Sequence, residues 1–457
     1  MQALKTTVFR TIIAILLLLP LGAKAQMLAS SVNTYSPYSM YGMGELSTKG
    51  NVIQRSMGGM GIAMWTNNMV NVLNPAAYAL TPQKSFLFNF GLEGAHYRNN
   101  QTKYGTGNKV ETAYNSINIH DIAFQMPLAK NLGLGFSLTP YSSVGYNMYG
   151  DDLSQDVAGN VGSVSYQYKG DGDVTEVKVG AGWKPFNKLA IGIAAIYYWG
   201  NIKRSYETQV KNITGSGTYS STLGIDTYDV SRIKMQAGIM WSPIYRDDRI
   251  LTLAATYDFG GPIKPEMLKH VYVDNVLTSV VRQELEEALP LRLPHQVSAG
   301  FFYQSMKVRF GADYSYQDWG AQNTDYAESD GTGIVVAYTD THTVKVGFEL
   351  IPRYSDVAHY MNRMAYRVGA RMGDYYQTFG GCRVRQYAVT AGVGLPIRLF
   401  GRSSVNVGFE FGMRRPESES VMVNSQMVGM IKQTYYKMSI GLDLFGEDRW
   451  FVRQKFD

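Results

Sequence analysis

The chain has 457 residues, of which 43 are basic and 37 acidic, and half of its formal net charge of +6 comes from Lys5, Arg10 and Lys24. That balance is no argument for a nucleic-acid partner or an acidic substrate. The single cysteine, Cys382, excludes an internal disulfide framework. No stretch after residue 25 approaches the ~20 apolar residues of a membrane helix.

A short apolar segment opens the chain. Lys5 and Arg10 precede an apolar run from Thr11 to Leu21, and Ala23-Lys24-Ala25 supplies small residues for cleavage. This order predicts a secretory signal peptide over residues 1–25, so that the mature chain begins at Gln26. The run is too short to cross a bilayer as a helix, and no cysteine stands at the cleavage site to carry a lipid anchor. A buried core helix is the alternative.

Residues 26–82 carry little strand pattern but many methionines and glycines. Methionine packs against irregular surfaces, and glycine lets backbones approach closely. A disordered periplasmic tail, the alternative, would be more charged and less apolar than Met57 to Ala79. We therefore expect a compact hatch, or plug, in which Asn74, Pro75 and Ala76 lead into the first strand. Pro75 fixes its own φ and keeps Asn74 out of the helical region.

Residues 83–446 alternate between apolar and small or polar positions, which is the signature of strands. The apolar sets place aromatic residues near strand ends, as at membrane interfaces, and the segments approach the ~9–11 residues that span a tilted bilayer. The alternative is a soluble β-sandwich, whose strands are usually shorter. The clearest stretches are Thr175–Trp183, Leu189–Trp199, Val308–Tyr314, Val344–Leu350 and Val405–Phe411.

Short and long connections alternate along these segments, as the periplasmic turns and outer loops of a barrel do. We predict an all-β protein, a transmembrane antiparallel barrel of about 14 strands with an N-terminal hatch. The strand count is even, so residues 447–457 should form a periplasmic tail. Several charges fall on the inferred lumen face, where they should pair with one another or with the hatch. The candidates are Lys178, Arg309, Lys345, Arg383 and Arg385.

One long connection, Gly261 to Pro294, contains apolar residues at mixed helical spacing. This predicts an amphipathic helix over residues 265–289, which could capture a lipid-like ligand or simply pack on neighbouring loops. The candidate capture residues are Met267, Leu268, Val271, Leu277, Val281 and Leu285.

Several motifs resemble the long-chain fatty acid transporter (FadL) family in their order along the chain. A glycine-rich stretch from Arg55 precedes Asn74-Pro75-Ala76, as in the hatch of that family. Leu293-Pro294, Trp319 and the stretch from Asp340 are similar to its later hairpins. The resemblance covers residues 40 to 450 and implies a 14-stranded barrel, a hatch and diffusion of hydrophobic molecules across the outer membrane. In that family a basic lumen residue can receive a substrate carboxylate.

The sequence therefore favours a non-enzymatic protein of the outer membrane of a Gram-negative bacterium, without cofactor or metal. It would take up hydrophobic or amphipathic, fatty-acid-like small molecules passively, with membrane lipid and such ligands as its partners. The alternative is a non-conducting barrel subunit of a larger outer-membrane assembly or secretion complex, which the charged lumen favours. A strand kink with a lateral opening near the hatch would indicate transport, whereas an apolar patch suited to a partner would indicate a subunit. The motifs Gly-x-Ser-x-Gly, His-Glu-x-x-His and Cys-x-x-Cys are absent.

Overall fold

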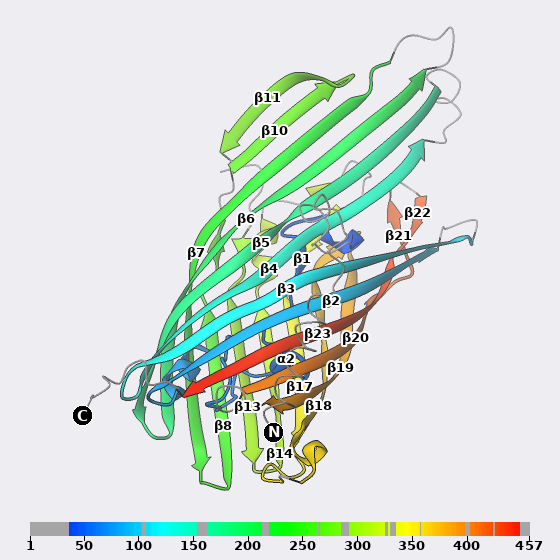
Figure 1. The fold of residues 1–457 in the computed structure, drawn as a ribbon. Coiled ribbons are helices and arrows are strands. Elements are labelled where there is room, and N and C mark those ends of the chain that lie inside the picture. Colours follow the sequence, from blue (N-terminus) through cyan, green and yellow to red (C-terminus); the bar gives the residue numbers. More distant parts are fainter. Residues whose placement is uncertain are drawn as a thin grey trace, which may run out of the picture.

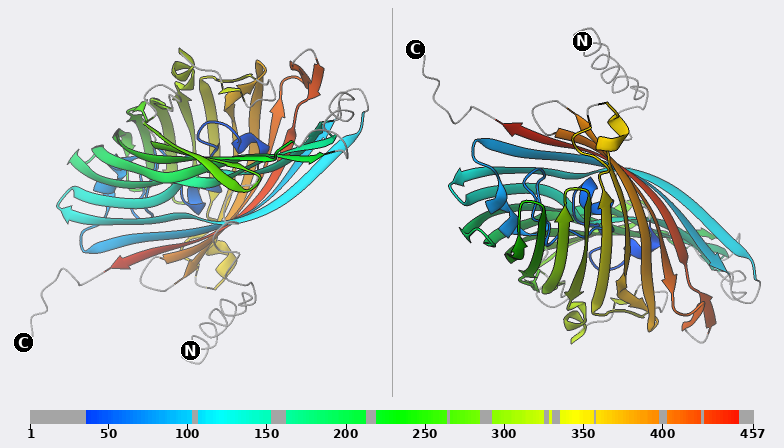
Figure 2. Two further views of the ribbon diagram at one scale, coloured as in Figure 1. Left: turned by 90° about the horizontal axis from the view of Figure 1, so that it is seen from above. Right: turned by 90° about the horizontal axis from the view of Figure 1, so that it is seen from below.

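A computed structural model describes residues 36–447 apart from short gaps at 103–106, 153–161, 213–218, 264–265, 285–291, 325–327, 330–334, 357, 398–402 and 424–425. It shows a closed antiparallel barrel of 14 strands with a segment inside it (Figures 1 and 2). The last wall strand pairs with the first from Ser85 to Asn100, which closes the ring. The predicted signal peptide and tail lie mainly outside the described residues.

The predicted fold class and strand number are confirmed. The wall strands in ring order are β2 (Ser85–Thr102), β3 (Lys109–Ala129), β4 (Leu132–Asp152), β5 (Gly162–Phe186), β6 (Leu189–Asn212), β7 (Thr222–Tyr245), β8 (Arg249–Asp258), β13 (Gln296–Ser305), β14 (Val308–Gln317), β17 (Thr341–Leu350), β18 (Ala365–Phe379), β19 (Cys382–Ile397), β20 (Ser403–Pro416) and β23 (Lys432–Glu447).

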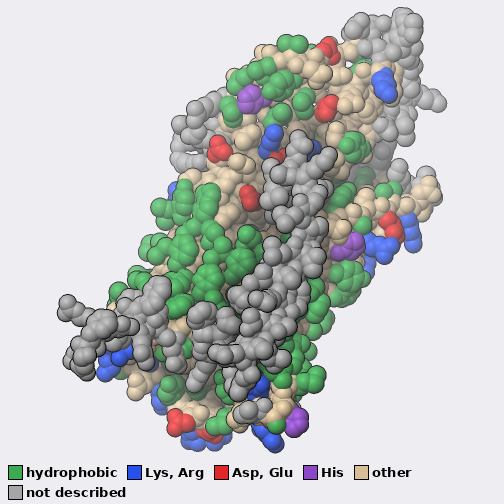
Figure 3. Space-filling view, in the orientation of Figure 1, with side chains coloured by type: hydrophobic (Ala, Val, Ile, Leu, Met, Phe, Trp, Pro, Cys, Tyr) green, Lys and Arg blue, Asp and Glu red, His purple; other side chains and the backbone are tan. Residues whose placement is uncertain are grey.

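Period-2 alternation turns one face of each strand outward and the other inward. Val179, Ile193, Phe310 and Phe409 point outward and are 54%, 61%, 41% and 53% exposed. The outward side chains form a broad apolar area over the lower wall (Figure 3). Exposed outward aromatics flank it, as expected at membrane interfaces. They are Trp183, Phe186, Trp241 and Tyr245 at the end with short turns, and Tyr197, Trp199, Tyr257 and Tyr314 towards the other end.

The hatch, residues 36–82 in the described part of the chain, lies within the barrel (Figure 2). Most of its side chains from Ser36 to Thr81 are buried. The exceptions are Pro37, residues 46–49 and Thr66, which are half-buried, and Asn67 and Asn68, which are exposed. Its elements, with η for a 3-10 helix, are η2 (Pro37–Ser39), β1 (Glu45–Leu46), α2 (Val52–Arg55) and η3 (Pro75–Leu80). The plug predicted from methionine and glycine content is thus confirmed. No helix among the described residues is long and apolar enough to cross a membrane.

The wall is much taller on one side than on the other. Strands β5, β6 and β7 have 24 or 25 residues, whereas β8, β13, β14 and β17 have 10. The tall strands continue beyond the apolar area as a twisted sheet (Figure 1). The short elements at the ends are β9 (Gly261–Pro262), β12 (Arg292–Leu293), β15 (Glu328–Ser329), β16 (Val335–Tyr338), β21 (Ser420–Val423), β22 (Gln426–Gly429), η4 (Trp319–Thr324) and η5 (Tyr360–Arg363).

The helix predicted over residues 265–289 is wrong. Strands β10 (Glu266–Val273) and β11 (Val276–Glu284) form a hairpin that extends the tall sheet by pairing β10 with β7. Asp274 and Asn275 take φ of +48° and +65° at its turn, a conformation that favours Asx residues. β-branched residues and a two-residue Asp-Asn turn decide the local structure here against the helical spacing.

Arginine in place of Val179 should lower the free energy of unfolding by about 2–4 kcal/mol, because a mid-bilayer charge on the lipid face is costly. The matched control is Val276→Arg, since Val276 is 65% exposed in the hairpin beyond the apolar area and should change stability by less than about 0.5 kcal/mol. Urea unfolding in lipid vesicles measures both. Equal losses for the two variants would contradict the assigned lipid face.

Candidate functional site: the hatch and the wall opening

The Asn-Pro-Ala motif begins η3 inside the barrel. The Asn74 side chain accepts a hydrogen bond from Ala76 N and donates one to Ile62 O at 3.0 Å, so it joins two parts of the hatch. Pro75 stands at the first helical position, where its missing N–H costs nothing. The helix then ends at Leu80 and the chain enters the wall at Ser85.

Glycines of the wall let the hatch backbone lie directly against the strands. A Cβ at Gly182 would stand 2.6 Å from Ala79 N and 2.7 Å from Pro75 O, and Gly192 and Gly238 face η3 in the same way. Gly347 and Gly369 do the same for the hatch at Met57 and Gly58. The glycine stripes of the strand sequences therefore mark hatch contacts rather than an open lumen.

Hydrogen bonds join the hatch backbone to polar side chains of the wall. Gly58 N donates to Thr390 Oγ1 at 2.9 Å, and Thr390 Oγ1 donates to Ser56 O at 3.0 Å. Gly61 N and Ile62 N both donate to Asp313 Oδ2, at 2.6 and 3.0 Å. The Arg55-to-Ala63 stretch, singled out in the sequence for its glycines, is thus held by β14 and β19.

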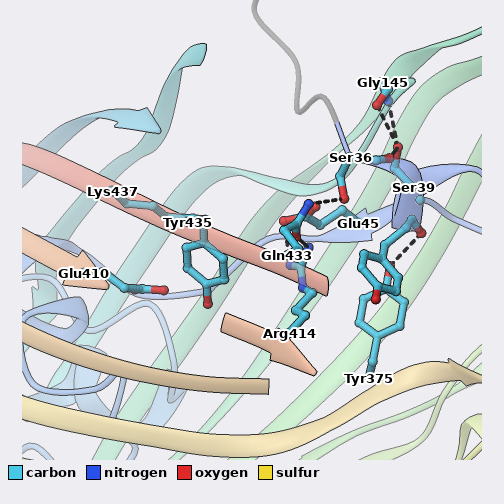
Figure 4. Close-up of polar contacts among 12 residues, drawn as sticks. Ser36, Ser39, Glu45, Gly145, Tyr375, Glu410, Arg414, Gln433, Tyr435 and Lys437 are labelled. Atoms are coloured by element: carbon cyan, nitrogen blue, oxygen red, sulfur yellow. Dashed lines mark hydrogen bonds and ion pairs between the residues drawn. The ribbon is translucent and has the colours of Figure 1, made fainter. Parts of the chain in front are cut away.

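Ion pairs between buried or half-buried side chains also hold the hatch against the wall. Arg414 of β20 donates to Glu45 of the hatch at 2.7 Å, and its guanidinium lies 5.4 Å from the ring centre of Tyr375 and 5.6 Å from that of Tyr435 (Figure 4). Two further ion pairs join hatch residues to the wall, and others lie within the wall itself. These pairs are Lys49–Glu176 at 3.0 Å, Arg55–Glu93, Arg371–Glu410, and Glu349 with Arg309 at 2.8 Å and with Arg367 at 2.6 Å.

Three of the predicted lumen charges lie inside the barrel. Lys178 is buried and donates to Val72 O at 2.7 Å and to Gln236 at 3.0 Å. Arg309 pairs with Glu349, and Lys345 lines an inner cavity of about 180 Å³ near the hatch. These positions support pairing with the hatch and the wall.

The placement of Arg383 and Arg385 on the lumen face is wrong. Cys382 and Val384 of β19 point inward and are buried, so the two arginines point outward and are exposed. Arg385 pairs with Glu417 at 3.0 Å. In β19 the even-numbered residues point inward, as the buried Ala388 and Thr390 show. The sequence alone did not reveal which face of this strand turns inward, because that depends on its register with the neighbouring strands.

The candidate capture residues lie on the β10–β11 hairpin. Met267 is buried in a large aromatic cluster under the tall sheet, and Leu268 and Val271 are half-buried. Leu277 and Val281 of β11 are 48% and 38% exposed, and Leu285 lies outside the described residues. The described residues of this set therefore lie partly in the buried cluster and partly on the exposed surface, and they do not form a single apolar binding site.

The wall has an opening between β3 and β4. Their ladder runs from Ala129–Leu132 only as far as Ile122–Leu138, while β3 stays paired with β2 up to Lys109 and β4 with β5 up to Asp152. Above that point the two strands diverge (Figure 1). Part of the β4 edge is covered from inside by the hatch, because Glu45 and Leu46 pair with Ser143 and Ser142.

Irregularities on both strands lie at the base of this wall opening. A bulge in β4 lies between Pro140 and Ser142, and proline supplies no N–H to a ladder. A bulge in β3 lies opposite Gly91 and Leu92 of β2, which pair with Asp121 and Ile119 and leave His120 without a partner in this ladder. As a result, the side chains of His120 and Asp121 are both buried. Neither bulge was recognised in the sequence, where Pro140 inside a strand pattern was the available signal.

A cavity of about 260 Å³ lies at the wall opening. Its lining mixes polar and charged groups of the hatch and the wall, including Arg55, Glu93, Asn118 and Lys437, with apolar Ile119 and Leu138. A second cavity, of about 360 Å³, lies below the hatch and is amphipathic. Met57, Met64 and Phe302 line one part of it, and Arg309, Glu349 and Arg367 another.

Methionine in place of Arg414 should lower the free energy of unfolding by about 3–5 kcal/mol, because Glu45 is then left buried without its partner. Arg385→Met is the matched control, since its exposed pair with Glu417 is worth only about 0–1 kcal/mol. Denaturant unfolding compares the two, and adding Glu45→Gln should recover part of the first loss. Equal effects of Arg414→Met and Arg385→Met would show that the inner pair does not fasten the hatch.

Solved structures share this fold at low sequence identity. A FadL homologue from Pseudomonas aeruginosa matches with a TM-score of 0.60 and 14% identity over 88% of this chain and 99% of its own. The Pseudomonas putida toluene transporter TodX gives 0.53 and 13% over 90% and 99%, and the Ralstonia pickettii toluene transporter TbuX gives 0.51 and 13% over 89% and 99%. The resemblance to FadL-type barrels is confirmed at the level of fold.

No curated protein matches the chain. A family model described as BamG matches residues 8–457, which is nearly the whole sequence. A match of that extent includes the hatch, all wall strands and the hydrogen bonds and ion pairs that join them. This chain, a FadL-like barrel in its fold, belongs to the BamG family.

Proposed function

We propose that this protein is exported, loses residues 1–25 and sits in the outer membrane of a Gram-negative bacterium, where it passes hydrophobic or amphipathic small molecules passively. Residues 26–82 would act as its hatch and residues 83–446 as its wall. The observation that carries the proposal is the wall opening between β3 and β4, with the hatch directly behind it.

The wall opening reaches the depth of the apolar area. Ile117 and Ile119 of β3 are 70% and 52% exposed on the outward face, beside the diverging edge. Open strand edges are not tolerated where they face lipid tails, so a break at this depth requires water, a ligand or another chain beside it. A solute leaving the barrel here would enter the membrane sideways.

The amphipathic cavity supports an amphipathic ligand. Its methionine and phenylalanine wall suits an apolar tail, and the exposed part of Arg309 suits an anionic head group. The neighbouring structures include proteins named as toluene transporters and a monoaromatic hydrocarbon channel. A fatty-acid-like substrate is the finer proposal, since an anionic head would use Arg309.

The hatch has to move for such a molecule to pass. Between the amphipathic cavity and the wall opening lie Arg55 and Glu93, whose buried pair would have to separate or rotate. Passive movement down a gradient fits a membrane that has no ATP supply on either side.

Uptake measurements test the route. Asn118→Trp should fill the cavity behind the wall opening and reduce uptake of a fluorescent long-chain fatty acid and of labelled toluene to the level of cells lacking the protein. Asn115→Trp is the matched control, because Asn115 lies on the same strand, is exposed and does not line that cavity. Uptake that is identical with and without the protein would overturn the transport proposal.

The ion-paired interior favours a second function, a non-conducting barrel subunit of a larger outer-membrane assembly. Five buried charge pairs fill the lumen of the described chain where a greasy path would run, and each would be costly to break. Strand β11 adds an exposed apolar edge, with Val276, Leu277 and Val280 at 65%, 48% and 53% exposure. Within the described residues β11 forms a ladder only with β10, and free edges are common pairing sites.

A deletion strain separates the two functions. If no hydrophobic probe depends on the protein while its loss lowers the amounts of other outer-membrane proteins, the subunit function holds. A variant lacking residues 266–284 should then reproduce the defect, because it removes the hairpin while leaving the 14 wall strands.

A further inference from the structure

The largest of the described cavities, about 900 Å³, opens at the end of the barrel with the short turns. That end faces the periplasm in outer-membrane barrels. We call it the mouth cavity. Its floor is the hatch and the residue after it, at Trp65 to Asn68 and Ala79 to Gln83, and its rim is built from the turns and strand ends of five hairpins. Asn67 and Asn68 are exposed there.

All charged residues that line the mouth cavity are basic. Its lining contains five basic residues and no acidic residue, and the basic residues come from separate turns and strand ends. They are Lys130, Lys184, Lys307, Arg309 and Arg353. Of these, Arg309 pairs with Glu349, and no ion pair within the described chain is found for the other four. Several like charges around one concave surface attract a partner of the opposite charge.

Nearby acidic groups are directed elsewhere. Asn362 and the backbone N–H groups of His359 and Ala358 donate to Asp356 and hold the pKa of its carboxyl at about 2. This carboxylate therefore remains ionised at neutral pH, but its oxygens are committed to its own turn. At the turn between β7 and β8, Asp248 Oδ2 lies 3.4 Å from Arg249 Nε, so this carboxylate is paired within its own hairpin.

Aromatic side chains complete the mouth cavity. Trp65 of the hatch packs edge-on against Tyr245 of β7, with ring centres 6.1 Å apart, and Tyr354 is exposed on the rim. Tryptophan, tyrosine and arginine are the residues enriched where proteins bind one another. A basic, aromatic concavity of this size is suited to a short peptide segment.

We propose that the mouth cavity binds an acidic polypeptide segment of a periplasmic partner protein. Glutamate or aspartate side chains of the segment pair with Lys130, Lys184, Lys307 and Arg353, while its apolar atoms pack on Trp65 and Tyr245. Because the floor is the hatch, the bound segment contacts the plug directly. The mouth cavity shares Thr66, Asn68 and Arg309 with the amphipathic cavity, but peptide binding there does not require that the barrel conducts.

Peptide binding to the purified full chain in lipid nanodiscs tests this. The probe is a labelled twelve-residue peptide of alternating glutamate and serine with one central tryptophan, followed by fluorescence anisotropy. A peptide with glutamine in place of glutamate is the uncharged control. We expect the acidic peptide to bind more tightly than the control, and its affinity to fall as salt rises. Hydrogen exchange should slow in residues 65–68 and 79–83 of the unmodified protein.

The combined variant Lys130→Glu, Lys184→Glu and Arg353→Glu should lose binding at least tenfold. Lys109→Glu, Lys203→Glu and Lys211→Glu make the same charge change at exposed sites on the tall side and should bind normally. Equal binding to both variants, or binding only of inorganic phosphate or of phosphatidylglycerol vesicles, would overturn the proposal. If the first variant does not fold, the exchange pattern of the unmodified protein decides, and unchanged exchange at the hatch floor overturns it.

Discussion

The buried pairing of hatch charges with wall charges is the interaction on which the rest of this structure depends. A 14-stranded wall encloses more space than its own side chains fill, and the chain fills it with its N-terminal segment. Glu45, Lys49 and Arg55 enter that space as charges, and each meets an opposite charge on the wall. An unpaired charge there would cost roughly several kcal/mol, so one position of the hatch is strongly preferred.

Wall glycines make the pairing geometrically possible. Where Gly182, Gly192 and Gly369 face inward, the hatch backbone approaches within contact of the strand backbone. The same positions with any side chain would push the hatch away and separate the charges. Close backbone contact and ion pairing are therefore two parts of one fastening, and movement of the hatch would have to release both.

The two surfaces with functional character both adjoin this plug. The wall opening between β3 and β4 is backed by Glu45 and Leu46, and the mouth cavity has Trp65 as part of its floor. An event at either surface would act on the same segment. Both proposed functions therefore depend on how firmly the hatch is held inside the barrel.

The sequence by itself determined the class of fold, because period-2 alternation and alternating turn lengths follow from each strand's own residues. It also indicated the hatch and placed Lys178 and Arg309 inside. Tertiary structure alone decided the register of β19, which turned Arg383 and Arg385 outward. In the hairpin at residues 266–284, the β-branched residues and the Asp274-Asn275 turn were local signals, and only the pairing of β10 with β7 is a tertiary contribution. The wall opening became visible only in the tertiary structure, where the ladder between β3 and β4 ends at Ile122–Leu138 beside bulges in both strands. The residues of a strand determine which of its faces is apolar. The neighbouring strands determine where the hydrogen-bonded ladder ends and which charged side chains pair.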